Sequence, residues 1–450
     1  MTNLPPLYLE KMKTLLGEDL ASYEATFSRP ASRGFLINTA KIGTAKFDEI
    51  FPLPTRPVPY LENGRILDSE EKIGGNVLHA AGLFYMQDPG AMSAIAALPS
   101  IGKKVLDVAA APGGKTIGAA LLSPDSFIVA NEIDFKRAKI LLQNVERLGL
   151  KNVGVTSLTP KDLGKFAKET FDLVICDLPC SGEGMFRKES AAVECWNEGI
   201  NAMNAERQKE ILSSVLPCLK EGGTLLYSTC TYAPEEDEEI AEFLVKEKGL
   251  VLVSPKDAVL PCTAPGVGSF RNIGFARRFY PHIAEGEGQF FAVFEKPGEK
   301  LYAQKAIPSS LSANERKTIR AFTDEFIEGE IGELVKSGDK IFAVHPLAQT
   351  IPLRYLSEGV CIGEIVKGRF EPHHNLFTAF GASFKNKEEI PFGDKRISEY
   401  LYGLEIEAKT AKEGYSAVCA GGFPLGGGKV VNGTIKNKYP KGLRTMKLDL

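Results

Sequence analysis

Two cysteines and one aspartate are the residues of this 450-residue chain whose types and spacing best suit covalent chemistry. Asp177 and Cys180 end the run D-L-V-I-C-D-L-P-C, and Cys230 ends the run G-G-T-L-L-Y-S-T-C. A thiolate is a strong nucleophile once a nearby positive charge or helix end lowers its pKa. A pyrimidine that a thiolate attacks at carbon 6 becomes nucleophilic at carbon 5 and can accept a methyl group from a sulfonium, while an acid such as Asp177 holds its amino edge. The residues alone do not rank the two thiols.

A second stretch, residues 105–116, has the composition of a ligand-binding turn. It reads V-L-D-V-A-A-A-P-G-G-K-T, and its small residues let the backbone approach a ligand closely. It matches neither G-x-G-x-x-G nor G-x-x-x-x-G-K-[ST], so ATP binding is not expected. Glu132, at the end of the next strand, is placed to bind a pair of ribose hydroxyls, which predicts a nucleoside-type cofactor. Asp134 is expected to cap the following helix, and Lys115 is either a cation facing the ligand or a solvated surface lysine.

The loop after Cys180 adds flexibility and positive charge. It carries Gly182 and Gly184 and closes on Arg187 and Lys188. Glycines beside two cations suit a ligand that is both planar and phosphorylated.

The remaining titratable residues have simpler interpretations. We expect surface or core roles for His282, His373 and His374, and we expect the acidic run at 235–239 to form the first turn of a helix. Eight scattered cysteines without a C-x-x-C pair predict neither a disulfide framework nor a zinc site. Small buried apolar roles are expected for five cysteines: Cys176, Cys218, Cys262, Cys361 and Cys419.

The elements that must position these residues alternate between apolar strands and amphipathic helices from Lys103 to about Lys296. Such alternation predicts a doubly wound α/β sheet, in which ligands bind at the carboxyl ends of the strands. All three chemistry-bearing stretches fall at such ends. Two aromatic runs, residues 277–282 and 288–295, are expected to be the closing strands.

The flanking regions differ in texture. A helix that stops at Gly17 and a strand at 34–39 precede four prolines at 52–59, which we interpret as a stiff connector. A helix-prone segment at 312–333 leads to short glycine-rich strands. The tail is either a local basic surface or a solvated charged end. Its basic residues are Lys429, Lys436, Lys438, Lys441, Arg444 and Lys447, with Tyr439 among them.

Composition narrows the functional classes. The net charge of -3 means that any attraction to nucleic acid must be local rather than global. The chain starts without the pattern of a signal peptide and has no apolar run of about eighteen residues, so a cytoplasmic location is expected.

Longer motifs resemble those of a known family. A-A-A-P-G-G-K-T, D-L-P-C-S-G-E-G-M-F-R-K and S-T-C-T-Y-A-P-E-E-D-E resemble the cofactor loop, fourth motif and sixth motif of the Sun-type (Nop/Sun, Fmu) RNA 5-methylcytosine methyltransferases. Residues 30–42, 82–88, R-F-Y-P-H and G-E-G-Q-F-F resemble the family's opening and last strands. G-E-I-V-K-G-R-F-E-P-H-H, P-L-G-G-G-K-V and K-N-K-Y-P-K-G-L-R resemble the tail of a bacterial subgroup that acts on 16S rRNA. The resemblance covers nearly the whole chain.

The resemblance implies an α/β fold: a Rossmann-like S-adenosylmethionine-dependent methyltransferase core with a small N-terminal α+β domain and a C-terminal PUA-like RNA-binding region. We accordingly predict an N-terminal RNA-binding domain at 1–75, a catalytic domain at 76–298, a linker and intermediate domain at 299–380 and a PUA-like domain at 381–450. The implied activity is methylation of carbon 5 of cytosine in the decoding region of 16S rRNA. The implied partner is 16S rRNA or the small ribosomal subunit, and a monomer without metal or membrane is expected.

Residue by residue, the resemblance makes Cys230 the nucleophile that attacks carbon 6. Cys180 then helps to release the product, and Asp177 contacts both base and cofactor. The implied S-adenosylmethionine-binding residues are Ala109, Ala110, Ala111, Pro112, Gly113, Gly114, Lys115 and Glu132, together with Asp177.

Some positions depart from the family pattern. Ala109 stands where cysteine is frequent, Leu36 where the opening has arginine, and Asp237 where asparagine is common. The third strand is followed by T-S-L-T-P, so the acid that many family members use near the adenine amine is missing around Thr159. Two alternatives stay open: a tRNA cytosine-C5 methyltransferase, and a catalytically idle ribosome-assembly factor that keeps the fold.

Overall fold

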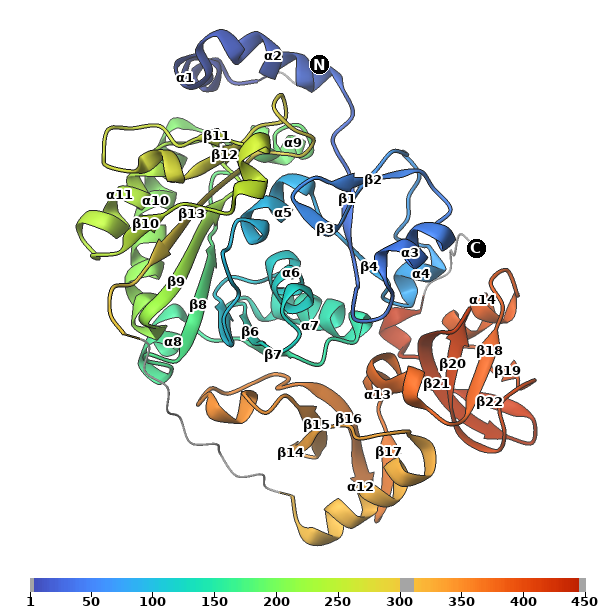
Figure 1. Cartoon of the computed structure of the whole chain (residues 1–450). Coiled ribbons are helices and arrows are strands. Elements are labelled where there is room, and N and C mark those ends of the chain that lie inside the picture. The colour runs from blue at the N-terminus through green and yellow to red at the C-terminus, as the bar shows by residue number, and fades with distance from the viewer. Residues whose placement is uncertain (1–3, 300–310, 445–450) are drawn as a thin grey trace.

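The computed structural model describes residues 4–299 and 311–444, so Lys447 of the predicted basic tail lies outside the described residues. Four β-sheets organise these residues. The largest belongs to the central domain, one precedes it in the chain and two follow it (Figure 1).

The central sheet confirms the predicted doubly wound α/β core. Strands β5 to β9 run parallel, and the order reverses between β5 and β8, so the carboxyl ends of these two strands form a switch point. The closing strands β12 and β13 are antiparallel additions, as the aromatic runs predicted. In spatial order the strands are β11 (Ala264–Pro265), β12 (Arg277–Phe279), β13 (Gln289–Glu295), β9 (Leu219–Thr229), β8 (Phe171–Asp177), β5 (Lys104–Asp107), β6 (Phe127–Asn131) and β7 (Val153–Thr156), with β10 (Val251–Val253) on β13.

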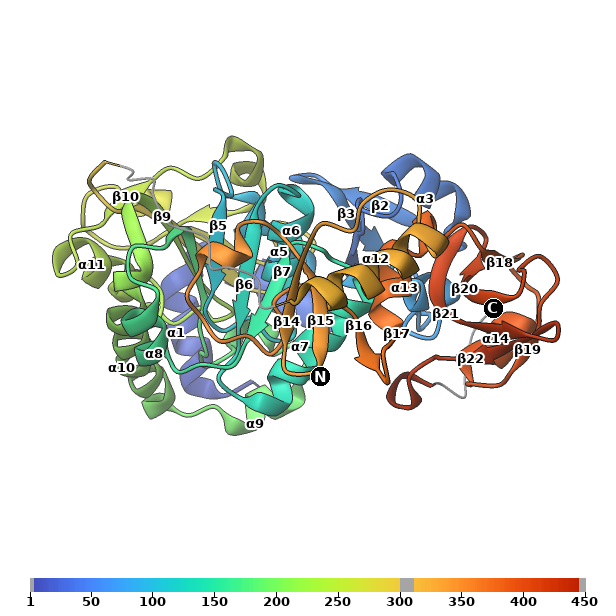
Figure 2. The ribbon, with the colours of Figure 1, turned by 90° about the horizontal axis from the view of Figure 1, so that it is seen from below.

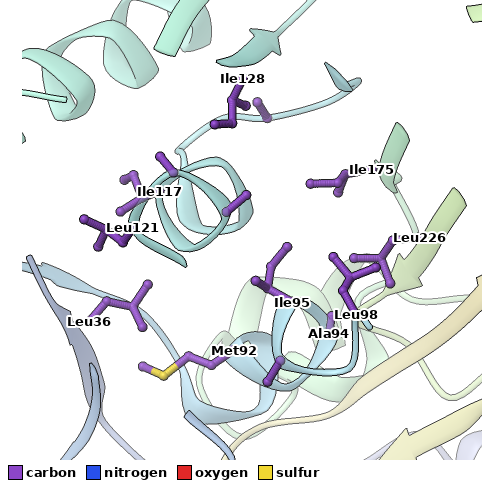
Figure 3. Close-up of a cluster of buried hydrophobic side chains, with 14 of the residues drawn as sticks. Leu36, Met92, Ala94, Ile95, Leu98, Ile117, Leu121, Ile128, Ile175 and Leu226 are labelled. Carbon is purple, nitrogen blue, oxygen red and sulfur yellow. The ribbon is translucent and has the colours of Figure 1, made fainter. Parts of the chain in front are cut away.

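Helices cover both faces of this sheet. On one face, Met92 and Ile95 of α5 pack with Ile117 of α6 and with sheet residues such as Ile175 (Figure 3). On the other face, side chains of α8, α10 and α11 form a second apolar cluster. The helices of this domain are α5 (Pro89–Ala96), α6 (Gly114–Leu122), α7 (Phe135–Leu148), α8 (Pro160–Phe166), α9 (Ser190–Cys195), α10 (Glu198–Val215) and α11 (Glu238–Lys246).

A four-stranded sheet precedes the core, in the order β2 (Thr55–Val58), β3 (Leu61–Leu67), β1 (Gly34–Ile37) and β4 (Phe84–Met86), with helices α3 (Thr44–Ile50) and α4 (Val77–Ala80). The interpretation of residues 52–59 as a connector is wrong, because 55–58 form an edge strand, where Pro57 is tolerated since no partner needs its missing N–H. Because β4 belongs to this sheet, we propose that the N-terminal unit extends past residue 75 to Met86.

The first two helices pack on the core rather than on this sheet. Helices α1 (Pro6–Leu16) and α2 (Leu20–Ala25) lie beside α9 and β12 in Figure 1. Tyr8, Met12 and Tyr23 form an apolar cluster with Phe186 and Tyr232 of the core. The N-terminal segment therefore packs against the loops that follow β8 and β9.

Two sheets follow the core, shown from below in Figure 2. The first is β14 (Glu333–Ser337), β15 (Lys340–Val344), β16 (Val360–Val366) and β17 (Arg369–Pro372), with α12 (Ala313–Phe326) and α13 (His374–Phe380). The second is β18 (Lys387–Ile390), β20 (Gly414–Ala420), β21 (Phe423–Val431), β22 (Thr434–Asn437) and β19 (Ile406–Glu407), with α14 (Arg396–Leu401). The predicted helix at 312–333 ends at Phe326, and residues 333–337 are a strand.

The predicted basic tail is partly neutralised by its own fold. Lys436 pairs with Glu405 at 2.7 Å and Lys438 with Glu371 at 3.0 Å. Tyr439 is buried rather than presented to solvent. The tail therefore offers less free positive charge than its composition suggests.

Candidate active site

The two candidate thiols meet because their strands are neighbours. β8 and β9 are parallel, with Asp177 opposite Ser228, so the residues that follow both strands emerge at one edge of the sheet. The Sγ atoms of Cys180 and Cys230 are 3.4 Å apart. The hydrogen bond with Cys230, and burial, raise the pKa of the Cys180 thiol. Cys180 therefore holds its proton and can donate it in a hydrogen bond to the sulfur of Cys230.

A hydroxyl pair joins the loops that carry these thiols. Ser181 follows Cys180, Thr231 follows Cys230, and their Oγ and Oγ1 atoms are 2.6 Å apart. Both side chains are buried. The pair therefore fixes one loop against the other immediately beside the sulfur contact.

The buried carboxylate of Glu236 holds the loop that carries Ser181 in place. Glu236 accepts hydrogen bonds from the Ser181 amide at 3.1 Å, from Asn201 Nδ2 at 2.9 Å and from Gln208 Nε2 at 3.0 Å. Burial raises its pKa. The prediction that 235–239 form the acidic first turn of a helix is confirmed for Glu238 and Glu239 but is wrong for Glu236, which precedes α11 and is completely buried beside the donors of α10.

A cavity of about 340 Å³ opens at the carboxyl ends of β5 and β8. Of the two candidate cysteines, Cys230 is among the residues that line this cavity and Cys180 is not. The predicted site residues that line it are Ala109, Ala110, Ala111, Pro112, Gly114, Lys115, Asp177 and Cys230. Gly113 and Glu132 are not in its wall.

Lys115 is not a solvated lysine. Its side chain is 6% exposed, and its Nζ lies 2.7 Å from Asp177 Oδ2. Ser228 Oγ donates to the other oxygen, Asp177 Oδ1, at 2.8 Å. These two contacts fix the orientation of the Asp177 carboxylate at the cavity wall, between the glycine-rich turn and the thiols.

Near the turn between β5 and α6, Asp107 and Glu132 each have one buried carboxylate oxygen that accepts no hydrogen bond. Asp107 Oδ2 accepts a hydrogen bond from Thr116, but Oδ1 has no partner, and burial raises the pKa of Asp107 to about 7. Glu132 Oε1 accepts from the Asp134 amide, whereas Oε2 accepts no hydrogen bond, although Arg137 lies 3.5 Å away. Buried acceptors that receive no hydrogen bond suit a ligand that carries an ammonium group and ribose hydroxyls.

The two cations of the loop after Cys180 are engaged within the protein. Arg187 lies 3.3 Å from Glu287, and Lys188 pairs with Asp88. The buried Glu287 and the partly buried Asp88 therefore compensate both charges in this structure, and the prediction that the two cations face a phosphorylated ligand stays a prediction.

The weaker candidates lie elsewhere. Asp134 caps α7 by accepting from the Lys136 and Arg137 amides, as predicted. His282 makes a tilted ring contact with Tyr280, and His373 caps α13, both outside the cavity wall. Among the described residues, no group of three or more histidine, cysteine or acidic side chains is arranged to hold a metal ion.

Sequence comparison places these features in one family. A model of the 16S rRNA methyltransferase RsmB/F matches residues 94–295, a model of the RsmF N-terminal domain matches 4–89, and a model of the RsmF PUA domain matches 387–445. A ribosomal RNA small subunit methyltransferase F of Shewanella sp. (strain MR-4) is 31% identical across 93% of this chain and 92% of its own length. The chain belongs to the RsmF family. The family that the motifs resembled is thereby confirmed.

Other RsmF proteins and solved structures agree. The relative from Klebsiella pneumoniae (strain 342) is 30% identical over 98% of this chain and 96% of its own. A methyltransferase homologue from Pyrococcus horikoshii superposes with a TM-score of 0.57 at 28% identity, covering 66% of this chain and 96% of that one. NSun6 from the same organism, solved with SFG, shares the fold at 22% identity and a TM-score of 0.57, covering 66% of this chain and all of its own, 100%.

Several wall residues of this RsmF-family site were not predicted from the sequence. Gln87 and Asp88 come from the segment after β4, and Glu287 and Gly288 from the segment before β13. An acid between two glycines, directly before an aromatic strand, was the available signal for Glu287.

No helix within residues 4–299 and 311–444 is long and apolar enough to span a bilayer.

Proposed function

We propose that this protein uses S-adenosylmethionine to methylate carbon 5 of a cytosine in 16S rRNA, through a covalent bond between Cys230 and the base. The observation that carries the proposal is the arrangement of the two cysteines: their sulfurs are 3.4 Å apart, and of the two residues Cys230 lines the cavity shared with Asp177 and the Ala109–Lys115 turn. An argument from sequence could not rank the thiols, whereas the position of Cys230 in the cavity wall favours it as the nucleophile.

The turn between β5 and α6 would hold the cofactor. Asp107 Oδ1 offers an acceptor for the ammonium group, and Glu132 Oε2 offers one for the ribose hydroxyls. The three alanines and Gly113 leave the backbone open to close approach, and a Cβ on Gly113 would lie 3.2 Å from Ile117. When bound, S-adenosylmethionine supplies an electrophilic methyl group.

The chain's own residues would prepare and complete the reaction. The Cys230 thiolate adds to carbon 6, while Asp177, oriented by Lys115 and Ser228, accepts from the amino edge of the base and holds it in place. The thiol of Cys180 donates a hydrogen bond to the Cys230 sulfur. After carbon 5 has gained the methyl group, its proton leaves to solvent, the carbon–sulfur bond breaks with assistance from Cys180, and Cys230 regains its electron pair.

The cytosine must be flipped or already unstacked, because a stacked base exposes neither face of carbon 6. Single-stranded or bulged RNA in the decoding region is therefore the proposed local substrate, held by the N-terminal unit and the C-terminal region that matches the RsmF PUA domain.

Methylation assays on 30S subunits, naked 16S rRNA and tRNA, followed by bisulfite sequencing, test the proposal. We expect 5-methylcytosine in 16S rRNA, and its loss from a deletion strain. Modification of tRNA alone would establish the tRNA enzyme instead. Cofactor binding without methyl transfer to any of the three RNAs would establish an idle assembly factor.

A further inference from the structure

Glu287 is a buried wall residue that the proposed reaction leaves unused. Its side chain is 1% exposed, and the residue lines the same cavity as Cys230 and Asp177. Its Oε1 accepts a hydrogen bond from the Ser32 amide at 3.2 Å and lies 3.3 Å from Arg187. Its Oε2 is buried and has no hydrogen-bond partner. A carboxylate oxygen without a donor costs free energy unless a ligand supplies one.

The backbone holds Glu287 close to the nucleophile. The Gly288 amide donates to the Gly184 carbonyl at 3.0 Å, and the Gly184 amide donates to the Cys230 carbonyl at 2.9 Å. The Glu287 amide itself donates to Asp88 Oδ1 at 2.8 Å. A pyrimidine whose carbon 6 meets the Cys230 sulfur therefore lies in the cavity that Glu287 closes.

The chemistry of this oxygen restricts what it can bind. Both oxygens of Asp177 already accept from Ser228 or Lys115, whereas Glu287 Oε2 accepts from nothing. Burial raises the pKa of Glu287, and Arg187 opposes that shift. An acceptor in this position selects a ligand that presents a hydrogen-bond donor. A cytidine has two such donors, the amino group of the base and the 2′-hydroxyl of the ribose.

We propose that Glu287 binds the flipped target nucleotide by accepting a hydrogen bond from one of these two donors. The amino group would make Glu287 a determinant of cytosine over uracil, and the hydroxyl would make it a determinant of RNA over DNA. The proposal rests on the proposed function, because it places the target nucleotide beside Cys230. It adds a contact to the substrate that Asp177 does not provide.

The test compares Glu287→Gln with Glu285→Gln in the full-length protein. Glu285 is the matched control because it lies two positions away, is half exposed and pairs with Arg56 at 2.6 Å. The probes are 16S rRNA fragments that carry, at the mapped target, cytidine, 2′-deoxycytidine or the 2-pyrimidinone riboside, which lacks the amino group. Single-turnover methyl transfer is measured for the first two, and covalent adduct formation for cytidine and the 2-pyrimidinone riboside.

We expect Glu287→Gln to slow the reaction of cytidine about 10- to 100-fold, as for a lost hydrogen bond to a charged group, and Glu285→Gln to slow it less than about twofold. The penalty should vanish on the analogue that lacks the relevant donor. A penalty that persists on both analogues would show a merely structural role, and equal rates for the two variants would also overturn the proposal. If the wild-type protein methylated no RNA cytosine, the proposed function itself would have failed, which is a separate result.

Discussion

The buried carboxylate of Glu236 should control how the two thiol loops are aligned. In Glu236→Gln, an amide nitrogen replaces one acceptor oxygen, and it must face either Asn201 or the donors from Ser181 and Gln208. The less costly orientation turns the amide nitrogen toward Asn201 and removes one hydrogen bond. A hydrogen bond to a charged acceptor contributes about 1.5–3 kcal/mol. Because the variant also avoids burying a charge, we expect a loss of about 1–3 kcal/mol in the free energy of unfolding.

Activity should fall as well, because Asn201, which also donates to Ser181 Oγ at 3.0 Å next to Cys180, loses its hydrogen bond to Glu236. Urea unfolding and single-turnover methyl transfer measure the two effects, with Glu239→Gln as the control, since Glu239 is exposed in the first turn of α11, the helix that follows Glu236. Burial raises the folded pKa of Glu236 above its unfolded value of about 4.3. Ionisation of Glu236 therefore makes the free energy of unfolding of the wild type highest below that value and lowers it as the pH rises through the folded pKa. If Glu236→Gln unfolded and turned over like Glu239→Gln, the supporting role would be refuted.

Three further outcomes are expected. Since the pKa of Asp107 is about 7, the affinity of the wild type for S-adenosylmethionine should rise from about pH 6 to about pH 8 in calorimetric titrations. Asp107→Asn should bind the cofactor weakly, with an affinity that does not change with pH. A pH dependence in the variant as steep as that of the wild type would contradict the role of Asp107. A Cβ in Gly288→Ala would lie 2.3 Å from Tyr232 Oη. This overpacking should lower the free energy of unfolding by about 1–3 kcal/mol and slow methyl transfer. An unchanged midpoint of urea unfolding would contradict the predicted overpacking. Arg278 is 1% exposed and pairs with Glu238. Arg278→Met leaves that carboxylate without its partner, so the free energy of unfolding should fall by about 3–5 kcal/mol and the melting temperature with it. An unchanged melting temperature would contradict this prediction.

The sequence carried enough local information to predict the core and the place of the thiols. Apolar runs that end in Asp107, Asp177 and Cys230 mark strand ends, and parallel strands bring such ends to one edge of a sheet. The predicted strands and the cap at Asp134 follow from patterns within a few residues of each other. Such features need no knowledge of distant contacts.

What the sequence could not show depends on partners far away in the chain. Glu236 looks like one member of a solvated acidic turn until Asn201 and Gln208 from α10 lie beside it. Arg187 looks free until Glu287, which is 100 positions later, pairs with it. Likewise, no local pattern distinguishes a helix that packs on its own sheet from α1, which docks on the core. The roles of the site residues stay predictions.

The central claim is that the sulfur of Cys230 forms the bond to the target base, with Cys180 needed for release. The most direct measurement incubates Cys180→Ser with 16S rRNA and S-adenosylmethionine, digests the product, and identifies by tandem mass spectrometry which peptide carries the nucleotide. We predict a methylated cytidine on the peptide that contains Cys230, and no adduct from Cys230→Ser. A nucleotide attached to Cys180 in the Cys230→Ser protein, with none on Cys230 in the other variant, would contradict the account.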